Sequence, residues 1–261
     1  MAKTDREVGR PRRASAQSGY RRAAETRRRV LDAALAVFGE AGYRAATTRQ
    51  ISERAGVTLP VLQYYFGDKE GLYRACAEVI VGRFHDLTAD VAADALAALR
   101  ADGAPEEARQ HLKALLGALV RFLAGSAEAE GWARFVAGEL QDPGPAFEIL
   151  YERLWRPGGD VTAALIARVI GRAAPDAEVR LKAQLLISTL LAFQAGRKQL
   201  TLRALGWSKI GEEELALILA TLNDQIDAIA PADGRPQPGP RKTDGLPRPQ
   251  RLAEVRAPRT P

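Results

Sequence analysis

Apolar side chains recur every three or four positions along most of the chain, which is the spacing that places residues on one face of an amphipathic helix. In residues 25–41, Leu31, Leu35 and Phe38 fall on one face, and Gly42 is a suitable helix end. No stretch alternates with the two-residue period of a strand over a useful length. The pattern therefore predicts an all-α protein. Further helices are expected over residues 106–124, 128–141, 145–155, 161–172, 176–195 and 212–229.

Residues 47–72 contain two short helical segments that meet at a glycine. Thr47 and Gln50 have the spacing of a capping box, which predicts the start of the first segment. Gly56 permits a tight corner, and Thr58 can cap the segment that follows. This layout predicts a helix-turn-helix, whose second helix is built to lie in a DNA major groove.

Few side chains of that short second helix can reach base edges. Gln63 can read adenine through two hydrogen bonds, and Leu59, one turn away on the same outer face, can touch a thymine methyl group. Helix starts attract phosphate, and nearby cations strengthen the attraction. The alternative is that the tyrosines are core residues and Arg49 is a solvated charge, although Tyr64 and Tyr65 cannot both be buried on so short a helix. The expected DNA contacts are Thr48, Arg49, Thr58, Leu59, Gln63, Tyr64, Tyr65 and Lys69.

The net charge of +6 is concentrated at the two ends of the chain. Residues 1–29 hold ten Lys/Arg and three Asp/Glu, and residues 231–261 hold seven and three, which leaves the middle at −5. A basic end beside a helix-turn-helix suits phosphate binding. Residues 9–13, GRPRR, resemble the core of an AT-hook, a short arginine arm of the kind that lies in a minor groove.

Several motifs in residues 26–75 have a fixed spacing: Thr47-Thr48-Arg49, Ala55-Gly56-Val57-Thr58, Tyr64-Tyr65-Phe66 and Lys69-Glu70. With this spacing, the segment resembles the DNA-binding domain of the TetR family of regulators. Residues 59–67 and the later stretch 145–151, PAFEILY, further resemble the CerR/CecR-like branch of that family. In much of the family a tyrosine stands where this chain has Gln63.

The resemblance implies a ligand-responsive, homodimeric transcription regulator, most often a repressor, that binds a palindromic operator in double-stranded DNA. It also implies that an unidentified small-molecule effector moves the helix expected from Asp68 to about Arg100, and that the last two helices pair across the dimer. Two apolar stripes suit such pairing, although each equally fits the core of the monomer. They are Leu181, Leu185, Ser188 and Ala192, and Leu215, Ile218, Leu222, Ile226 and Ile229.

Four parts of the chain are expected. Residues 1–22 are predicted to form a disordered basic arm, and residues 23–72 are predicted to form the helix-turn-helix DNA-binding domain. Residues 73–230 predict a helical effector-binding and dimerisation domain. Residues 231–261 hold eight prolines and predict a disordered Pro/Arg-rich tail.

The expected effector pocket is marked by aromatic side chains in the middle of the chain. Arg134, Glu139 and Gln141 are the polar candidates for orienting a ligand there. The alternative is that these aromatic residues, at helical spacing, are ordinary core. The predicted pocket residues are Trp132, Phe135, Phe147, Tyr151, Trp155 and Phe193.

No catalytic residue, cofactor or metal site is expected, because no phosphate loop, nucleophile elbow or zinc-spaced His/Cys set is present. His85 and His111 are expected at the surface or in structural roles, and Cys76 as a small buried hydrophobe. The apolar runs are too short to span a membrane and no secretory signal is present, which predicts a cytoplasmic protein. The chain therefore predicts a sequence-specific transcription regulator. The alternative is a sequence-indifferent architectural DNA-binding protein that uses its basic ends.

Overall fold

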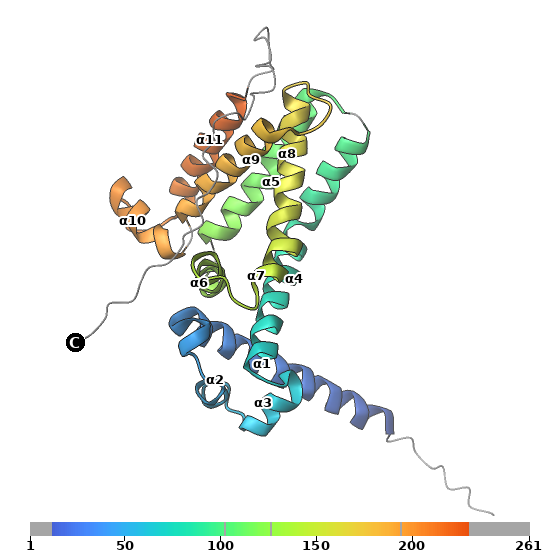
Figure 1. Ribbon diagram of the computed structural model, residues 1–261, viewed down its shortest axis with the longest axis vertical. Coiled ribbons are helices and arrows are strands. Elements are labelled where there is room, and N and C mark those ends of the chain that lie inside the picture. Colours follow the sequence, from blue (N-terminus) through green and yellow to red (C-terminus); the bar gives the residue numbers. More distant parts are fainter. Residues whose placement is uncertain (1–11, 102, 126, 194, 230–261) are drawn as a thin grey trace, which may run out of the picture. The chain divides into compact units, whose positions relative to one another are not determined.

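The computed structural model describes residues 12–101, 103–125, 127–193 and 195–229, and every regular element within these ranges is a helix (Figure 1). The expected all-α class is confirmed. None of the helices in these ranges is both long enough and apolar enough to cross a membrane.

The helix-turn-helix consists of α2 (Thr48–Ala55) and α3 (Leu59–Phe66). At the start of α2 the Gln50 N–H donates to Thr47 Oγ1 at 3.2 Å and the Thr47 N–H donates to Gln50 Oε1 at 2.9 Å, so the predicted capping box is present. Gly56 ends α2 with φ at 63°, in the left-handed region. Thr58 occupies the N-cap position of α3, but its side chain makes no capping hydrogen bond.

Helix α1 (Arg12–Ala45) begins well before the position expected from the apolar pattern. Residues 12–22 of the predicted flexible arm are therefore helical, whereas residues 1–11, with most of the AT-hook-like stretch, lie outside the described residues. Alanine, arginine and glutamine have high helix propensity without an apolar face, so periodicity alone does not reveal such a segment. Gly42, at φ 75°, interrupts the helix where its end was expected.

Helix α4 (Lys69–Arg100) is long and begins where it was expected, after Asp68, whose Oδ1 caps it by accepting from the Gly71 N–H at 2.7 Å. The expected segment 145–155 is divided into the short α7 and a wider π-helical turn, η1, and α9 is followed by a 3₁₀ turn, η2. Helix α10 (Ala195–Leu205) was not predicted. The remaining elements are α5 (Pro105–Gly125), α6 (Ala127–Gln141), α7 (Phe147–Leu150), η1 (Tyr151–Trp155), α8 (Arg156–Val169), α9 (Ala177–Leu190), η2 (Leu191–Phe193) and α11 (Glu212–Asp227).

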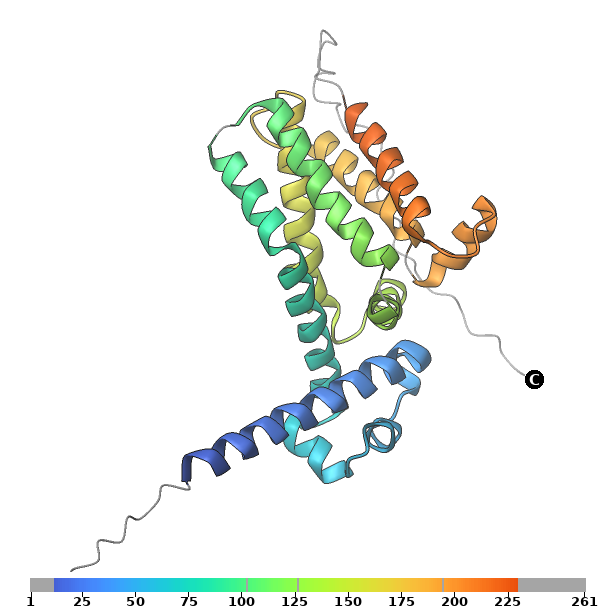
Figure 2. The ribbon, with the colours of Figure 1, turned by 180° about the vertical axis from the view of Figure 1, so that it is seen from behind.

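Two clusters of buried side chains form the interior. The first cluster joins α1, α2, α3 and the first half of α4 to α6 and α7, so side chains pack continuously across the boundary expected at residue 72. It includes Phe38, Leu62, Tyr73, Phe135 and Leu150. The second cluster, in the part of the chain that Figure 2 shows around α5, joins that helix to α8, α9 and α11. It includes Leu112, Leu165, Ile166, Val179 and Ile226.

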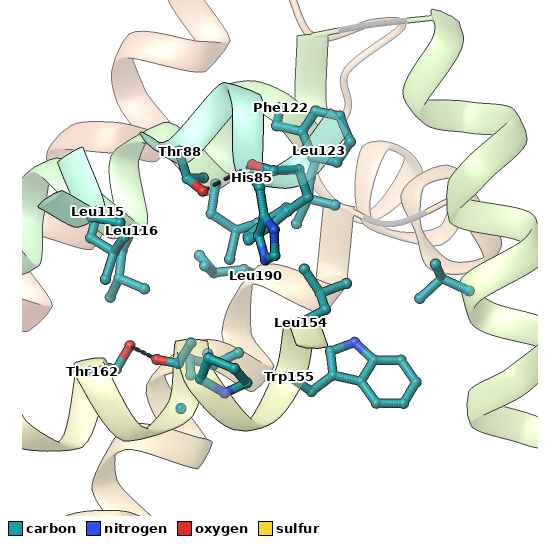
Figure 3. Close-up of a pocket in the computed structure, with 18 of the residues that line it drawn as sticks. His85, Thr88, Leu115, Leu116, Phe122, Leu123, Leu154, Trp155, Thr162 and Leu190 are labelled. Atoms are coloured by element: carbon teal, nitrogen blue, oxygen red, sulfur yellow. Dashed lines mark hydrogen bonds between the residues drawn. The ribbon is translucent and has the colours of Figure 1, made fainter. Parts of the chain in front are cut away.

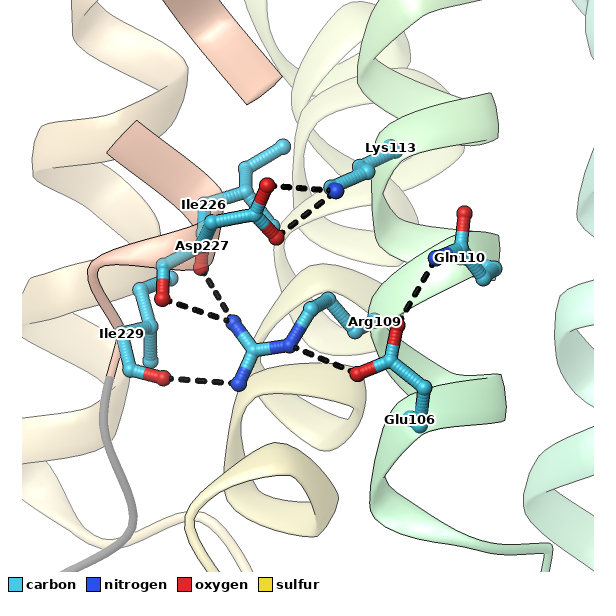
Figure 4. Close-up of polar contacts among 7 residues, drawn as sticks. All are labelled: Glu106, Arg109, Gln110, Lys113, Ile226, Asp227 and Ile229. Atoms are coloured by element: carbon cyan, nitrogen blue, oxygen red, sulfur yellow. Dashed lines mark hydrogen bonds and ion pairs between the residues drawn. The ribbon is translucent and has the colours of Figure 1, made fainter. Parts of the chain in front are cut away.

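The end of α11 is fastened to α5 by two cations (Figure 4). Arg109 Nη1 donates to the Ile226 carbonyl at 2.6 Å and Nη2 donates to the Ile229 carbonyl at 3.0 Å. Lys113 Nζ lies 2.7 Å from the Asp227 carboxylate. Because the last carbonyls of a helix have no partner within the helix and carry partial negative charge, this arrangement caps α11 and fixes it against α5.

Candidate DNA-binding surface and ligand cavity

Helix α3 presents a polar outer face and buries one apolar residue. Leu62 is fully buried in the first cluster, while Gln63 is exposed and Leu59, one turn earlier, is 39% exposed. Tyr64 is 83% exposed, and its ring packs edge-on against Tyr65 with centroids 5.3 Å apart. As expected, therefore, the two tyrosines are not both buried. The side chains proposed to reach bases are accessible to a DNA groove.

The residues expected to touch phosphate lie at the starts of α2 and α4. Thr48 is half-buried, and the exposed Arg49 forms an ion pair with Glu53 at 2.9 Å. Lys69 Nζ donates to the Arg44 carbonyl at 3.1 Å and lies 4.8 Å from the centroid of the Tyr43 ring. Each of these cations therefore has an intramolecular partner that DNA phosphate would have to share or replace.

Arg27, on α1, is a candidate DNA contact that the sequence patterns did not indicate. Its guanidinium lies 5.4 Å from the centroid of the Phe66 ring at the end of α3. It opens an exposed run of three arginines, residues 27–29. The net charge of the N-terminal region was the available signal, but the apolar pattern of α1 did not show which of its arginines lie next to α3.

A cavity of about 280 Å³ lies between the two buried clusters (Figure 3). Its walls come from α4, α5, α6, η1, α8, α9 and η2, and they include members of both clusters. The volume is near the lower end of the range typical of small-molecule sites. Most of the lining is hydrocarbon or aromatic, including Phe84, Leu116, Phe122, Trp132, Trp155 and Leu190.

Only two of the six predicted pocket residues, Trp132 and Trp155, line this cavity. Phe135 instead packs in the first cluster, with its ring centroid 4.4 Å from that of Tyr73. Phe147 and Tyr151 stack on each other outside the cavity, and Phe193 packs against the second cluster. These four residues therefore do not line this cavity, because an aromatic residue at helical spacing can equally fill a core. The signal that was missed is aliphatic: four leucines of α5 line the cavity.

The polar residues expected to orient a ligand do not line the cavity. Arg134 and Gln141 are exposed, and Glu139 is only 1% exposed within the first cluster. Tyr73 Oη donates to Glu139 Oε1 at 2.7 Å, and the Gly144 N–H donates to Oε2 at 3.0 Å. Burial, together with this bond to a carboxylate, raises the pKa of Tyr73 above its ordinary value. Glu139 thus links α6 to α4 instead of facing a ligand.

The polar side chains that do line the cavity were not expected there. They are His85 and Thr88 of α4, Arg153 of η1 and Thr162 of α8. His111 is not among the lining residues and lies 3.9 Å from Glu107 on its own helix. Cys76 is fully buried in the first cluster, and burial raises the pKa of its thiol, as fits a small core hydrophobe.

Together, an exposed recognition helix and a second helical region define the chain as a helix-turn-helix protein. Comparison with known proteins gives the family. A family model described as bacterial regulatory proteins, tetR family, matches residues 30–76. A second, described as the C-terminal domain of the HTH-type transcriptional dual regulator CecR, matches residues 108–232.

Individual relatives agree with these matches. The HTH-type transcriptional dual regulator CecR of Shigella flexneri is 32% identical over 207 residues, which is 78% of this chain and 91% of that protein. The HTH-type transcriptional regulator BetI of Escherichia coli K12 is 31% identical over 119 residues, 45% of this chain and 56% of BetI. The chain belongs to the TetR family of bacterial transcription regulators, which confirms the resemblance seen in the sequence.

Solved structures share the fold at low sequence identity. A TetR-like transcriptional regulator from Rhodococcus sp. RHA1 has a TM-score of 0.52 at 20% identity and covers 78% of this chain and 96% of its own. The transcriptional regulator FadR from Bacillus subtilis, in complex with stearoyl-CoA, has a TM-score of 0.51 at 19% identity, with coverage of 76% and 96%. At such identities the likeness establishes the fold alone.

Proposed function

We propose that this protein is a homodimeric regulator that acts in the cytoplasm, binds a two-fold symmetric operator and changes its operator affinity when a small molecule occupies the cavity. Repression is the simplest outcome when such an operator overlaps a promoter. Because the related CecR is named a dual regulator, activation at some promoters is the second outcome to be measured.

The observation that carries this proposal is the course of α4. The helix begins directly after α3, contributes Leu72 and Tyr73 to the first cluster, and then lines the cavity with Phe84 and Thr88. A ligand that favours one position of α4 therefore acts on the helix that directly follows α3 in the chain. Such a ligand changes DNA affinity only to the extent that it binds one of the two states better.

Helix α6 supplies a second connection between the cavity and the DNA-binding region. It lines the cavity with Trp132 and Val136, and one turn later it holds Tyr73 of α4 through the buried Glu139. Buried polar contacts of this kind have few alternative geometries, because each broken bond leaves an unpaired group in the interior. The Tyr73–Glu139 contact is therefore suited to transmit a change at the cavity to the DNA-binding region.

Dimerisation is proposed through the outer faces of α9 and α11. Leu181 and Leu185 of α9 are 58% and 60% exposed, and Leu217 of α11 is 57% exposed. By contrast, Ile218, Leu222 and Ile226 of the expected α11 stripe belong to the second cluster, so that stripe is core of the monomer. The exposed leucines on the two helices offer an apolar surface to a second copy.

The direct test is selection of bound DNA from a random pool by the full chain, followed by footprinting. We expect a palindrome whose half-sites lie about 34–36 Å apart, one turn of DNA. The architectural alternative predicts no consensus and uniform protection. Repeating the selection with candidate ligands then tests the cavity, because an effector reduces or redirects binding to the selected site. A consensus without two-fold symmetry would contradict the proposed dimer.

A further inference from the structure

The chemistry of the cavity narrows the class of ligand it can hold, and this inference rests on the proposed effector role of the cavity. Apart from Trp132 and Trp155, whose indole N–H groups can only donate, four polar side chains line it: His85, Thr88, Arg153 and Thr162. Figure 3 shows His85, Thr88 and Thr162 among the apolar side chains that make up the rest of the wall. What a ligand can bond to depends on which protons and lone pairs these four groups have already used.

Both threonine hydroxyls have donated their only proton. Thr88 Oγ1 donates to the Phe84 carbonyl at 2.9 Å, and Thr162 Oγ1 donates to the Gly158 carbonyl at 2.8 Å. A hydroxyl has one donor and two acceptor sites. Each threonine therefore faces the cavity as an acceptor of hydrogen bonds.

The hydrogen bond made by the His85 ring also leaves an acceptor free. Its Nε2 lies 2.9 Å from the backbone oxygen of Arg153 in η1. Because a carbonyl oxygen only accepts, Nε2 carries the proton in the neutral imidazole. Nδ1 is then left with a lone pair, so His85 is a third acceptor.

Arg153 is the only one of the four that carries a permanent charge. Its Nη1 is paired with the carboxylate of Glu78 on α4. A ligand carboxylate or phosphate would compete with Glu78 for this cation, and would bring its own negative charge next to that carboxylate. An anion in the cavity would therefore meet a cation whose charge Glu78 already offsets.

We infer that the cavity binds an uncharged molecule with an aromatic or apolar body and at least one hydrogen-bond donor, such as a phenolic O–H or an aromatic N–H, and that it excludes carboxylates. The body packs against the rings of Phe84, Phe122, Trp132 and Trp155. The donor pairs with one of the three free acceptors, His85 Nδ1, Thr88 Oγ1 or Thr162 Oγ1. An acceptor-only ligand of the same shape leaves these groups unpaired away from water, which lowers its affinity.

Three naphthalenes of similar size test this rule on the full-length protein at neutral pH. 2-Naphthol offers a donor, 2-methoxynaphthalene offers only an acceptor, and 2-naphthoate is an anion. The chain has three tryptophans, of which Trp132 and Trp155 line the cavity and Trp207 does not. In a Trp207→Phe background, quenching of tryptophan fluorescence therefore reports on the cavity, and calorimetry gives the affinity independently. We expect 2-naphthol to bind about tenfold more tightly than the ether, and 2-naphthoate to bind more weakly than both.

Variants identify the acceptor that is used. Thr88→Val and Thr162→Val keep the shape of the side chain and remove its hydroxyl, and His85→Phe removes Nδ1. At least one of the three should weaken 2-naphthol about tenfold and leave the ether unchanged. Thr221→Val is the matched control, because Thr221 makes the same bond to a carbonyl four residues earlier, at 2.8 Å, and does not line the cavity.

The outcomes separate this inference from the proposed function. Equal affinity for the naphthol and the ether, tight binding of 2-naphthoate, no binding of 2-naphthol, or no discrimination by any of the three variants would each overturn the inference about ligand class. If the ether or the anion nevertheless alters operator affinity, the effector role of the cavity stands without the donor rule. If 2-naphthol binds as expected and operator affinity does not change, the ligand class stands and the effector role fails.

Discussion

The proposed base reading by α3 would depend on very few side chains, since Leu62 is buried and only the outer face of this short helix is free. Gln63 is the one residue on that face whose amide can form two hydrogen bonds to adenine. We expect Gln63→Ala to weaken operator binding by about 1–3 kcal/mol, roughly five- to 150-fold, and to leave binding to random DNA nearly unchanged. Titration of both DNAs in the same buffer measures the difference.

Gln141→Ala is the matched control for this substitution, because Gln141 is an exposed glutamine at the end of α6. It should bind both DNAs like the unmodified protein. An equal loss of affinity on operator and random DNA in Gln63→Ala would show that Gln63 holds the backbone or the fold and reads no base.

Lys69 is expected to act on every DNA sequence alike. Its ammonium already has a carbonyl partner at the end of α1, but that oxygen carries no formal charge and leaves the cation able to neutralise a phosphate. We expect Lys69→Ala to lower affinity on all sequences and to reduce the slope of log affinity against log salt by about one. Lys69→Arg should restore the slope, and Lys209→Ala, an exposed lysine outside the helix-turn-helix, should not alter it. An unchanged slope in Lys69→Ala would assign Lys69 to the fold alone.

At this scale the sequence predicted what depends on near neighbours. The Thr47 capping box, the Gly56 corner and the exposure of Tyr64 follow from a few adjacent residues. The placement of Phe135 does not, because its position depends on a helix packed from far along the chain, through Phe38 and Tyr73. Local periodicity records which side of a helix is apolar but not whether that side meets a core or a cavity.

Two elements, α4 and α6, connect the cavity to the helix-turn-helix, and their buried joint can be tested apart from either site. We expect Tyr73→Phe to reduce the effect of a bound ligand on operator affinity while leaving ligand affinity itself nearly unchanged, because the hydroxyl does not line the cavity. The measurement is operator affinity with and without saturating ligand. Coupling between sites in proteins typically amounts to about 1–3 kcal/mol, which this comparison resolves.

Glu139→Gln and the double variant complete the cycle for this joint. If Tyr73 and Glu139 act through their mutual bond, the two substitutions together should reduce the coupling no further than either one alone. Strictly additive losses would mean that the two residues act separately. Thermal unfolding of all three variants tells a change in coupling from a general loss of stability.

The contacts that Arg109 and Lys113 make between α5 and α11 lead to a prediction about stability. Arg109 is largely buried and bonded to carbonyls at the end of α11 and just after it, so Arg109→Ala leaves those carbonyls without a charged donor. We expect a loss of about 2 kcal/mol and a fall in Tm of about 4–8 °C. Arg156→Ala, which removes an exposed pair with Glu152, should cost less than about 0.5 kcal/mol. Both are compared by urea unfolding at one protein concentration, and equal losses would contradict the capping role.

At the scale of elements, most helices were predictable because their apolar faces repeat over several turns. The start of α1 was missed since arginine and alanine form helix without an apolar face. Helix α10 was missed because few of its residues are buried: Leu202 is buried, while Leu200 and Leu205 are exposed. The cavity arises where two clusters meet, so the pattern of no single helix predicts it.

The molecule as a whole combines a basic N-terminal region with a middle that carries a net charge of −5. This asymmetry favours an approach to DNA with the helix-turn-helix first and disfavours nonspecific contact through the acidic helical region. One recognition helix offers too few contacts for selectivity, so the charge asymmetry alone does not produce an operator-specific regulator. In the proposed dimer, the second copy allows both half-sites to be bound at once, and binding at one half-site then raises the affinity at the other through effective concentration.

The proposed dimer surface can therefore be tested through DNA binding as well as through mass. Replacing Leu181 and Leu185 with glutamate places like charges on the exposed face of α9, and we expect a folded monomer in sedimentation and a loss of operator affinity of about two orders of magnitude. Affinity for a single half-site should change little, because α3 is untouched. Leu200→Glu on α10, also at an exposed leucine, is the control and should leave the dimer and the operator affinity intact. If the dimer survives the double substitution, the interface does not lie on this face of α9. A monomer that retains full operator affinity would instead remove the need for two copies.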